Sequence, residues 1–384
     1  MPQQIYLDHN ASTPPSPEVA EAVARALRDD FGNASSIHAF GQRAKAAIDD
    51  ARTEVAALIG AEPGDVVFTA TGTEADNLAL RGVVEAAGPS RTRVLVTAVE
   101  HEAVINTARA MARRGVPVTI LAVDGDGVVG SQAFEDALGD DAAIASVMLA
   151  NNETGVIQPV AALAAIARSR RIVFHTDAVQ AVGKIPVHVP ALGVDLLTLS
   201  GHKFGGPKGA GALWVRRGTP MAGVVTGGRQ ERNRRAGTEN VPAIVGLGVA
   251  ARLARARLAA ESARQLRLRD RLEAGILMAV PGSAVNGARA PRVPNTANIA
   301  FDRVEAESLL IALDLEGIAV STGAACSSGT LEPSHVLRAM GLPPARVQSS
   351  IRFSVGSTTT DDDIDRVLAV VPTIVQRLRA VNRR

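Results

Sequence analysis

The four residues Ser200-Gly201-His202-Lys203 carry the side chains that imine chemistry requires. They follow the apolar run 196–199, which predicts a short buried strand, and they precede the glycine-rich residues 204–211, which predict a loop. Lys203 would therefore lie at the carboxyl end of a strand, where open α/β sheets bind ligands. An amine there can form a Schiff base with a carbonyl compound when burial or a neighbouring cation lowers its pKa. A surface lysine on a glycine loop is the alternative.

Lysine is rare in this chain. It stands only at positions 45, 184, 203 and 208, and arginine supplies nearly all of the remaining positive charge. Arginine forms salt bridges as well as lysine does, but its guanidinium forms no imine. The scarcity of lysine therefore favours a specific role for Lys203.

Two further groups follow predicted strands. Gly72-Thr73 opens a predicted helix after the strand at 66–69. Backbone N–H groups and a hydroxyl at a helix N-terminus bind anions, most simply a phosphate, although an ordinary turn and cap is the alternative. His101 begins a helix after the strand at 94–97, where it could stack on a planar cofactor or move a proton. A surface histidine with satisfied hydrogen bonds is the alternative there.

Polar groups also follow the next two strands. Asn152 lies in the triplet 151–153, after a strand predicted at 144–149, although such triplets are also typical of turns. Asp177 and Gln180 follow the strand at 172–174. A carboxylate buried there needs a cationic partner, either a protonated ring nitrogen or a structural arginine. A lysine, an anion cradle, a carboxylate and a histidine are together what pyridoxal phosphate requires of a protein.

The last third of the chain adds two reactive groups. Cys326, the only cysteine, stands among Ser, Gly and Ala residues after a predicted strand at 318–321. These neighbours favour an accessible thiol and thus a candidate nucleophile, with a buried apolar cysteine as the alternative. Arg352 lies in the apolar strand 350–355. If its side chain points inward it needs an anion, best a carboxylate, whereas a half-exposed strand arginine needs none.

The elements that position these groups alternate between strand and helix. Strands are predicted at 66–69, 94–97, 118–123, 144–149, 172–174 and 196–199, with helical patterns between them. This order predicts an α/β fold with a mostly parallel sheet flanked by helices. A long helical stretch at about 241–280 leads into a smaller α+β unit. We predict a large domain at 15–260 and a small domain formed by 1–14 and 261–384.

Composition narrows the classes of function. Of the 384 residues 46% are hydrophobic and 3% aromatic, so a sizeable core must consist of Ala, Val, Leu and Ile. The net charge is +2, and the arginine-rich segments lack interleaved aromatic residues, so we expect no nucleic-acid binding. No apolar run approaches the roughly 20 residues of a membrane helix, and no signal peptide is evident. With one cysteine and no intramolecular disulfide, we expect a cytoplasmic protein.

Nine ordered segments, covering essentially the whole chain, resemble the cysteine desulfurases, specifically the branch that serves nitrogenase maturation and housekeeping iron–sulfur assembly. The segments are YLDHNASTP (6–14), TGTEADN (71–77), EH (100–101), NNETG (151–155), HTDAVQ (175–180), SGHK (200–203), RAGT (235–238), STGAAC (321–326) and SIR (350–352). The resemblance implies the fold of the aspartate-aminotransferase superfamily, with a sheet of the seven-stranded type. It also implies a homodimer and pyridoxal 5'-phosphate as cofactor.

The resemblance also implies roles for single residues. Lys203 would bind the cofactor covalently, and His101 would stack on its ring. Asp177 would pair with the ring nitrogen and Gln180 with the ring oxygen. The phosphate would be bound by Gly72, Thr73, Ser200 and His202, and by Thr238 of the partner subunit.

For the reaction, the resemblance implies a sulfurtransferase. L-cysteine would be bound by Arg352 through its carboxylate, with Asn152 beside the ring and the substrate. Lys203 would move the Cα proton and His101 would act as base for the thiol, giving L-alanine and a persulfide on Cys326. An iron–sulfur scaffold or another acceptor protein would then take the sulfur. No intrinsic metal is implied, although the persulfide could transiently ligate a cluster shared with a scaffold.

The departures from the family pattern are small. Ala34 stands where proline is usual and Thr322 where serine is common. The chain ends at Arg384, soon after the last predicted helix, so we expect no C-terminal extension that docks a scaffold. This expectation leaves the identity of the sulfur acceptor open.

Two alternatives remain. One is a selenocysteine lyase, or another pyridoxal-phosphate lyase or transaminase, that does not use Cys326. The other is a sulfur-carrier or scaffold-binding module without catalysis. The presence of Lys203, Asp177 and Arg352 argues against the second, because a binding module needs none of them.

Overall fold

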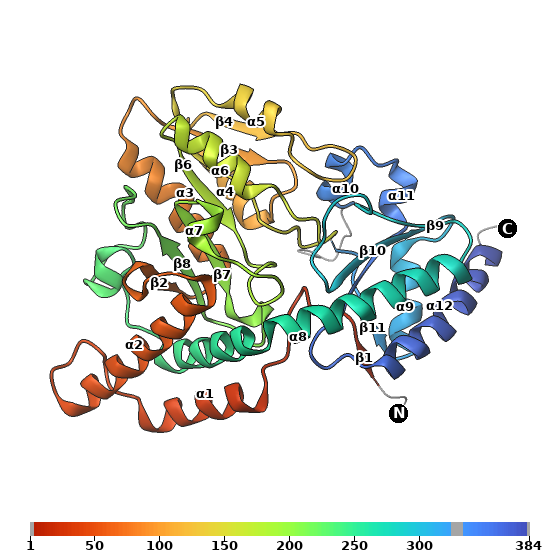
Figure 1. Ribbon diagram of the computed structural model, residues 1–384, viewed down its shortest axis with the longest axis horizontal. Helices are drawn as coiled ribbons and strands as arrows, with labels where there is room; N and C mark the ends of the chain where they lie inside the picture. Colours follow the sequence, from red (N-terminus) through yellow and green to blue (C-terminus); the bar gives the residue numbers. More distant parts are fainter. Residues whose placement is uncertain (1–3, 324–332, 382–384) are drawn as a thin grey trace.

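A seven-stranded sheet forms the centre of the larger part of the computed structural model, which describes residues 4–323 and 333–381 (Figure 1). Strand β8 is antiparallel to both of its neighbours, and the other neighbouring pairs are parallel. The prediction of a mostly parallel sheet is therefore confirmed. In spatial order the strands are β2 (Val66–Thr69), β8 (Gly211–Val215), β7 (Leu196–Ser200), β6 (Val173–Asp177), β5 (Ala142–Ser146), β3 (Arg93–Thr97) and β4 (Val118–Leu121).

Helices cover both faces of this sheet because its strands are apolar on both sides. In β3, Val94 and Val96 join the core on one face, with α3 (Gly72–Ala87) and α4 (Glu102–Ala112). Leu95 joins the core on the opposite face. The remaining helices of this part are α1 (Pro17–Asp29), α2 (Ala39–Ile59), α5 (Ser131–Ala137), α6 (Val160–Ser169) and α7 (Val189–Leu192).

The smaller part has its own sheet and its own core. Strand β10 (Thr296–Phe301) lies between β9 (Ser283–Val285) and β12 (Ser350–Ser354), antiparallel to both. The N-terminal strand β1 (Ile5–Tyr6) pairs in parallel with β11 (Ile318–Ala319), so the N-terminal segment packs onto this part of the chain. Its helices are α9 (Ala306–Leu315), α10 (His335–Ala339), α11 (Pro344–Gln348) and α12 (Asp361–Val381).

Helix α8 (Val241–Ala279) runs along both parts, as Figure 1 shows. Leu247 and Ala251 pack into the core of the larger part. Leu268 and Leu272 pack into the core of the smaller part. The long helix predicted at about 241–280 is thus confirmed, while the domain limits given above stay a prediction.

The structure differs from the predicted elements in a few places. Strands β8 and β9 were not predicted, and β6 continues to Asp177 because its end pairs with β7 through Thr198. Strand β5 ends at Ser146 rather than at residue 149, although Val147 and Leu149 still donate backbone hydrogen bonds toward β6. Within the described residues, no helix combines the length and apolar character that a membrane crossing requires.

Candidate active site

A cavity of about 270 Å³ lies at the carboxyl ends of β6 and β7, beside the N-terminus of α3. Parallel strands bring their carboxyl ends to one edge of a sheet, which is why residues distant in sequence meet here. Thr71, Asp76, Met148 and Val179 line it without having been predicted. The predicted residues that line it are Gly72, Thr73, His101, Asn152, Asp177, Gln180, Ser200, His202 and Lys203.

Lys203 ends a single turn of 3-10 helix, Gly201–Lys203, that directly follows β7. Its amine donates hydrogen bonds to the backbone carbonyl oxygens of Asn10, at 2.7 Å, and Ala11, at 3.0 Å. Burial lowers the pKa of this amine to about 8, and the positive charge of Arg352 adds to the shift. Lys203 is therefore much closer to its neutral, nucleophilic form at neutral pH than an ordinary lysine.

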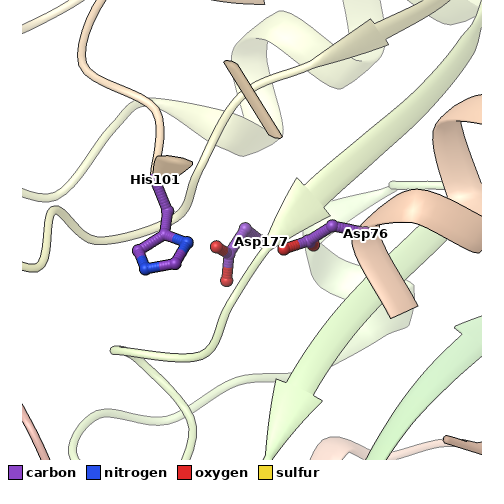
Figure 2. A group of neighbouring side chains, drawn as sticks. All are labelled: Asp76, His101 and Asp177. Atoms are coloured by element: carbon purple, nitrogen blue, oxygen red, sulfur yellow. The ribbon is translucent and has the colours of Figure 1, made fainter. Parts of the chain in front are cut away.

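Asp177 lies between His101 and Asp76, and side-chain atoms of the three come within 4.8 Å of one another (Figure 2). Burial raises the pKa of the Asp177 carboxyl, while a proton bound to His101 or to the Lys203 amine acts to lower it. The pKa of Asp76 is raised well above its usual range, first by burial and then by the charge of Asp177. Two carboxylates this close cannot both be ionised in a buried site, so Asp76 keeps its proton and Asp177 holds the charge.

The His101 ring caps helix α4. Its Nδ1 accepts a hydrogen bond of 3.1 Å from the backbone N–H of Ala103. Burial lowers the pKa of His101, so the ring is neutral and its one proton is on Nε2. The ring thus presents a proton at Nε2 and carries no charge of its own.

The N-terminus of α3 forms the anion-binding end of the cavity. Thr71 caps the helix through a 3.0 Å hydrogen bond from the Glu74 N–H to its hydroxyl. The first N–H groups of a helix have no partner within it, so those of Gly72 and Thr73 remain available to a ligand. A Cβ atom on Gly72 would lie only 3.0 Å from Val179 Cγ2 and 3.4 Å from Ser200 Cβ, so glycine keeps this end open.

Arg352 lies beside the cavity in β12 and is almost fully buried. Its guanidinium donates to the Asn152 carbonyl oxygen at 2.9 Å and to Asp8 Oδ1 at 2.7 Å. Among the described residues, Arg352 Nε and Asn152 Oδ1 are buried without a hydrogen-bond partner. The inward orientation expected for Arg352 is therefore present, next to polar atoms that can receive a ligand.

Two predicted residues are not placed in the cavity. Cys326 belongs to residues 324–332, outside the described part of the chain. Residues close to both ends of that segment lie near Glu153. Ser334 donates a 2.5 Å hydrogen bond to its carboxylate, and a Cβ atom on Gly323 would lie 3.1 Å from its Oε2. Thr238 is exposed and does not line the cavity of its own chain.

These groups fit pyridoxal phosphate. The N-terminus of α3 suits its phosphate, the Asp177 carboxylate suits its ring nitrogen, and the amine of Lys203 suits its aldehyde. The unpartnered Asn152 Oδ1 is a buried acceptor that a polar ligand in the cavity would satisfy. The residues that would hold the cofactor are therefore already arranged around one space.

Comparison with known proteins decides the family. The model of the class-V aminotransferase family matches residues 5–367. The "Cysteine desulfurase" of Trichormus azollae is 48% identical over 378 residues, which are 98% of this chain and 94% of the relative. The chain belongs to the cysteine desulfurase family.

Solved structures agree with this assignment to the cysteine desulfurases. A NifS-like protein superposes with a TM-score of 0.91 at 33% identity, covering 98% of this chain and 100% of that one. The structure described as SspA in complex with cysteine has a TM-score of 0.82 at 31% identity, covering 92% and 99% of the two chains. The pyridoxal-phosphate transferase fold expected from the sequence is confirmed.

Sequence reasoning missed several residues that build the site. Asn10, Lys184 and Glu153 are buried and hydrogen-bonded to residues that line the cavity or flank the Cys326 segment. Asn10 and Glu153 lie inside two of the nine segments, and Lys184 is one of only four lysines. Membership of a family segment and the scarcity of lysine were both visible in the sequence, but neither indicates which side chains these residues contact.

Proposed function

We propose that this protein is a pyridoxal-phosphate-dependent cysteine desulfurase that converts L-cysteine to L-alanine and leaves a persulfide on Cys326. The observation that carries the proposal is the single cavity shared by the Lys203 amine, the Asp177 carboxylate and the N-terminus of α3. The cysteine bound in the structure of SspA supports L-cysteine as the substrate.

Each residue of the cavity has a task in this reaction. When bound, pyridoxal phosphate supplies an electron sink for the electrons of the substrate Cα–H bond. The Lys203 amine takes the Cα proton, for which its lowered pKa of about 8 suits it. Asp177 stays ionised to hold a protonated ring nitrogen, and Arg352 orients the substrate carboxylate.

The sulfur step balances without an outside oxidant. The Cys326 thiolate attacks the substrate sulfur, the C–S bond of L-cysteine breaks and an S–S bond forms. The substrate carbon gains two electrons as it becomes the methyl group of alanine, and each of the two sulfurs in the new S–S bond gives up one. The proton that the Cys326 thiol loses ends on that methyl group, and the His101 ring can relay it, being neutral before and after the step.

We further propose a homodimer in which Thr238 of the partner subunit completes the phosphate site. The exposed position of Thr238, away from its own cavity, supports this arrangement. Large apolar side chains gathered around the start of α2 also favour a protein partner, because Phe31 is 70% exposed and Ile37 93% exposed. An iron–sulfur scaffold or another acceptor protein in the cytoplasm would take the sulfur.

The experiment measures alanine and persulfide formed from L-cysteine by the wild-type protein and by Cys326→Ser. The visible absorbance of the bound cofactor is followed in both. A desulfurase makes both products, whereas Cys326→Ser keeps the absorbance and makes neither. Alanine produced by the variant at the wild-type rate would instead indicate a lyase that does not use Cys326. A wild-type protein that makes no product would indicate a non-catalytic module.

A further inference from the structure

Lys184 lies behind the cavity and has no assigned role. It is 5% exposed, in the turn that follows β6. Its amine donates hydrogen bonds to Gln180 Oε1 at 2.5 Å and to Asn10 Oδ1 at 2.9 Å. In the described part of the chain it forms no ion pair with a carboxylate. A buried lysine with two uncharged acceptors and no counter-ion is unusual and requires an explanation.

The hydrogen bonds match an uncharged amine. A neutral amine has two N–H groups, and the two acceptors of Lys184 use both. A charged ammonium would carry a third N–H without a partner in a buried place. Burial and the positive charges of Lys203 and Arg352 lower the pKa of Lys184 well below its usual value, in agreement with this count.

Lys184 also determines how Gln180 presents its amide. The amide nitrogen of Gln180 donates to the backbone carbonyl oxygen of Asn10 at 2.9 Å. With Oε1 held by Lys184, the second N–H of that nitrogen is the group left for the cavity that Gln180 lines. The same Asn10 carbonyl oxygen accepts from the Lys203 amine at 2.7 Å. One residue, Asn10, therefore connects Lys184 with both groups.

We propose that Lys184 is a positioning residue, which donates to Gln180 and Asn10 as a neutral amine and so directs the Gln180 N–H and the Lys203 amine toward the cofactor. The inference rests on the proposed function, in which Gln180 meets the ring oxygen. Charged and titratable groups near Lys184 come from the N-terminal segment, the 3-10 turn after β7, α8 and β12. They are His9, His202, Lys203, Arg257, Glu261 and Arg352.

The test uses the holoenzyme and three variants, Lys184→Met, Lys184→Gln and Lys184→Arg. Retention of cofactor on dialysis and the pH midpoint of its visible absorbance are measured beside kcat and KM. Lys45→Met is the matched control, because Lys45 is an exposed lysine on α2 that forms an ion pair with Asp49. It should leave every readout unchanged.

Three results are expected. Lys184→Met removes a donor from Gln180 Oε1 and from Asn10 Oδ1, which keeps its 2.9 Å hydrogen bond from Asn295 Nδ2. This loss should weaken cofactor retention about tenfold or more. Lys184→Arg places a permanent cation near Lys203, which disfavours a protonated nitrogen there and should lower the absorbance midpoint by about one pH unit. Lys184→Gln, a neutral donor, should keep the wild-type midpoint and retain cofactor better than Lys184→Met.

Other results would overturn the inference. Wild-type retention and midpoint in Lys184→Met would show that the two hydrogen bonds position nothing. If Lys184→Met does not fold, an unchanged midpoint in Lys184→Arg contradicts the role on its own. A wild-type protein that takes up no cofactor would contradict the proposed function itself. If instead the wild-type protein takes up the cofactor and the variants change neither retention nor midpoint, only the role of Lys184 is contradicted.

Discussion

The amine of Lys203 and the backbone carbonyl oxygen of Asn10 form a 2.7 Å hydrogen bond across 193 positions of the chain. The N-terminal segment that carries Asn10 is itself fixed, since the Asn10 N–H donates to Ser354 Oγ in β12 and the Thr13 N–H donates to the His202 carbonyl. The direction of the reactive amine therefore depends on a segment anchored to the smaller part of the molecule.

His101→Phe should separate ring stacking from proton transfer. Phenylalanine keeps an aromatic ring over the cofactor but has no nitrogen to exchange a proton. We expect the visible absorbance to persist while alanine formation falls by a factor of about 10² to 10⁴. His38→Phe is the control, because His38 also caps a helix through Nδ1, at the start of α2, and does not line the cavity. Equal losses in the two variants would attribute the effect to the lost cap.

Arg352→Lys should raise KM for L-cysteine more than it lowers kcat. Lysine keeps the positive charge but cannot bind a carboxylate through two parallel N–H groups. We expect KM to rise about tenfold or more in steady-state kinetics. Arg346→Lys is the control, because the Arg346 guanidinium donates a hydrogen bond to Asn286 in the same part of the chain. It should leave KM unchanged. An unchanged KM in Arg352→Lys would show that Arg352 does not bind the substrate carboxylate.

Glu100→Gln should flatten the dependence of stability on pH. Burial raises the pKa of Glu100 to about 8, and its Oε2 has no partner among the described residues. The folded protein therefore binds this proton more tightly than the unfolded chain does. The stability from this group is fully present below the unfolded pKa and is lost as the pH rises through about 8, with a slope of up to ~1.4 kcal/mol per pH unit.

Urea unfolding of the wild type and of Glu100→Gln between pH 5 and 8 measures this slope. The variant keeps the shape of the side chain and its acceptor for the Thr97 hydroxyl, but it has no proton to lose. Its advantage over the wild type should grow steadily with pH. Parallel stability profiles would mean that Glu100 is ionised in the folded protein.

In the buried ion pair of Arg52 and Glu231, the effects of the two side chains on the free energy of unfolding should depend strongly on each other. Two hydrogen bonds of 2.8 and 2.7 Å join the side chains, and Glu231 also accepts from the Phe68 N–H in β2. Arg52→Met or Glu231→Gln alone should destabilise the protein by about 3–5 kcal/mol, since each leaves a buried group unpaired. The double variant should lose clearly less than the sum of the two.

Chemical denaturation of the four proteins in this cycle gives the coupling energy. The exposed pair of Arg28 and Glu21 is the control, and its cycle should give a coupling of at most about 1 kcal/mol. Additive losses at Arg52 and Glu231 would show that the two side chains act independently.

The sequence predicted the edge of the sheet where the site lies, because strand ends can be read from local patterns. Lys203, Asp177 and Gly72 each stand directly at such an end, and the parallel topology brings them together. Lys184 and Asn10 could not be placed this way. Their contacts depend on the path of the N-terminal segment across the molecule, which no local pattern specifies.

Strand β8 was missed for a different reason. Its residues 211–215 follow a glycine-rich stretch, and the first of them, Gly211, looked like the end of a loop. In the structure a Cβ atom on Gly211 would lie 2.7 Å from the backbone of Thr71. Glycine is needed there for the close approach of two backbones, so a residue that suggests a loop in fact begins a strand.

Helix α8 has 39 residues and so extends over about 58 Å, with each of its halves buried in a different hydrophobic core. Loss of either core exposes an apolar surface of the same helix, which links the opening of one core to the opening of the other. Backbone amides of α9 and α12, which belong to the core of the smaller part and do not line the cavity, should consequently exchange with solvent more slowly once the cofactor is bound at the end of β7. Ligand binding at one core would thus be measured as slower amide exchange in the other.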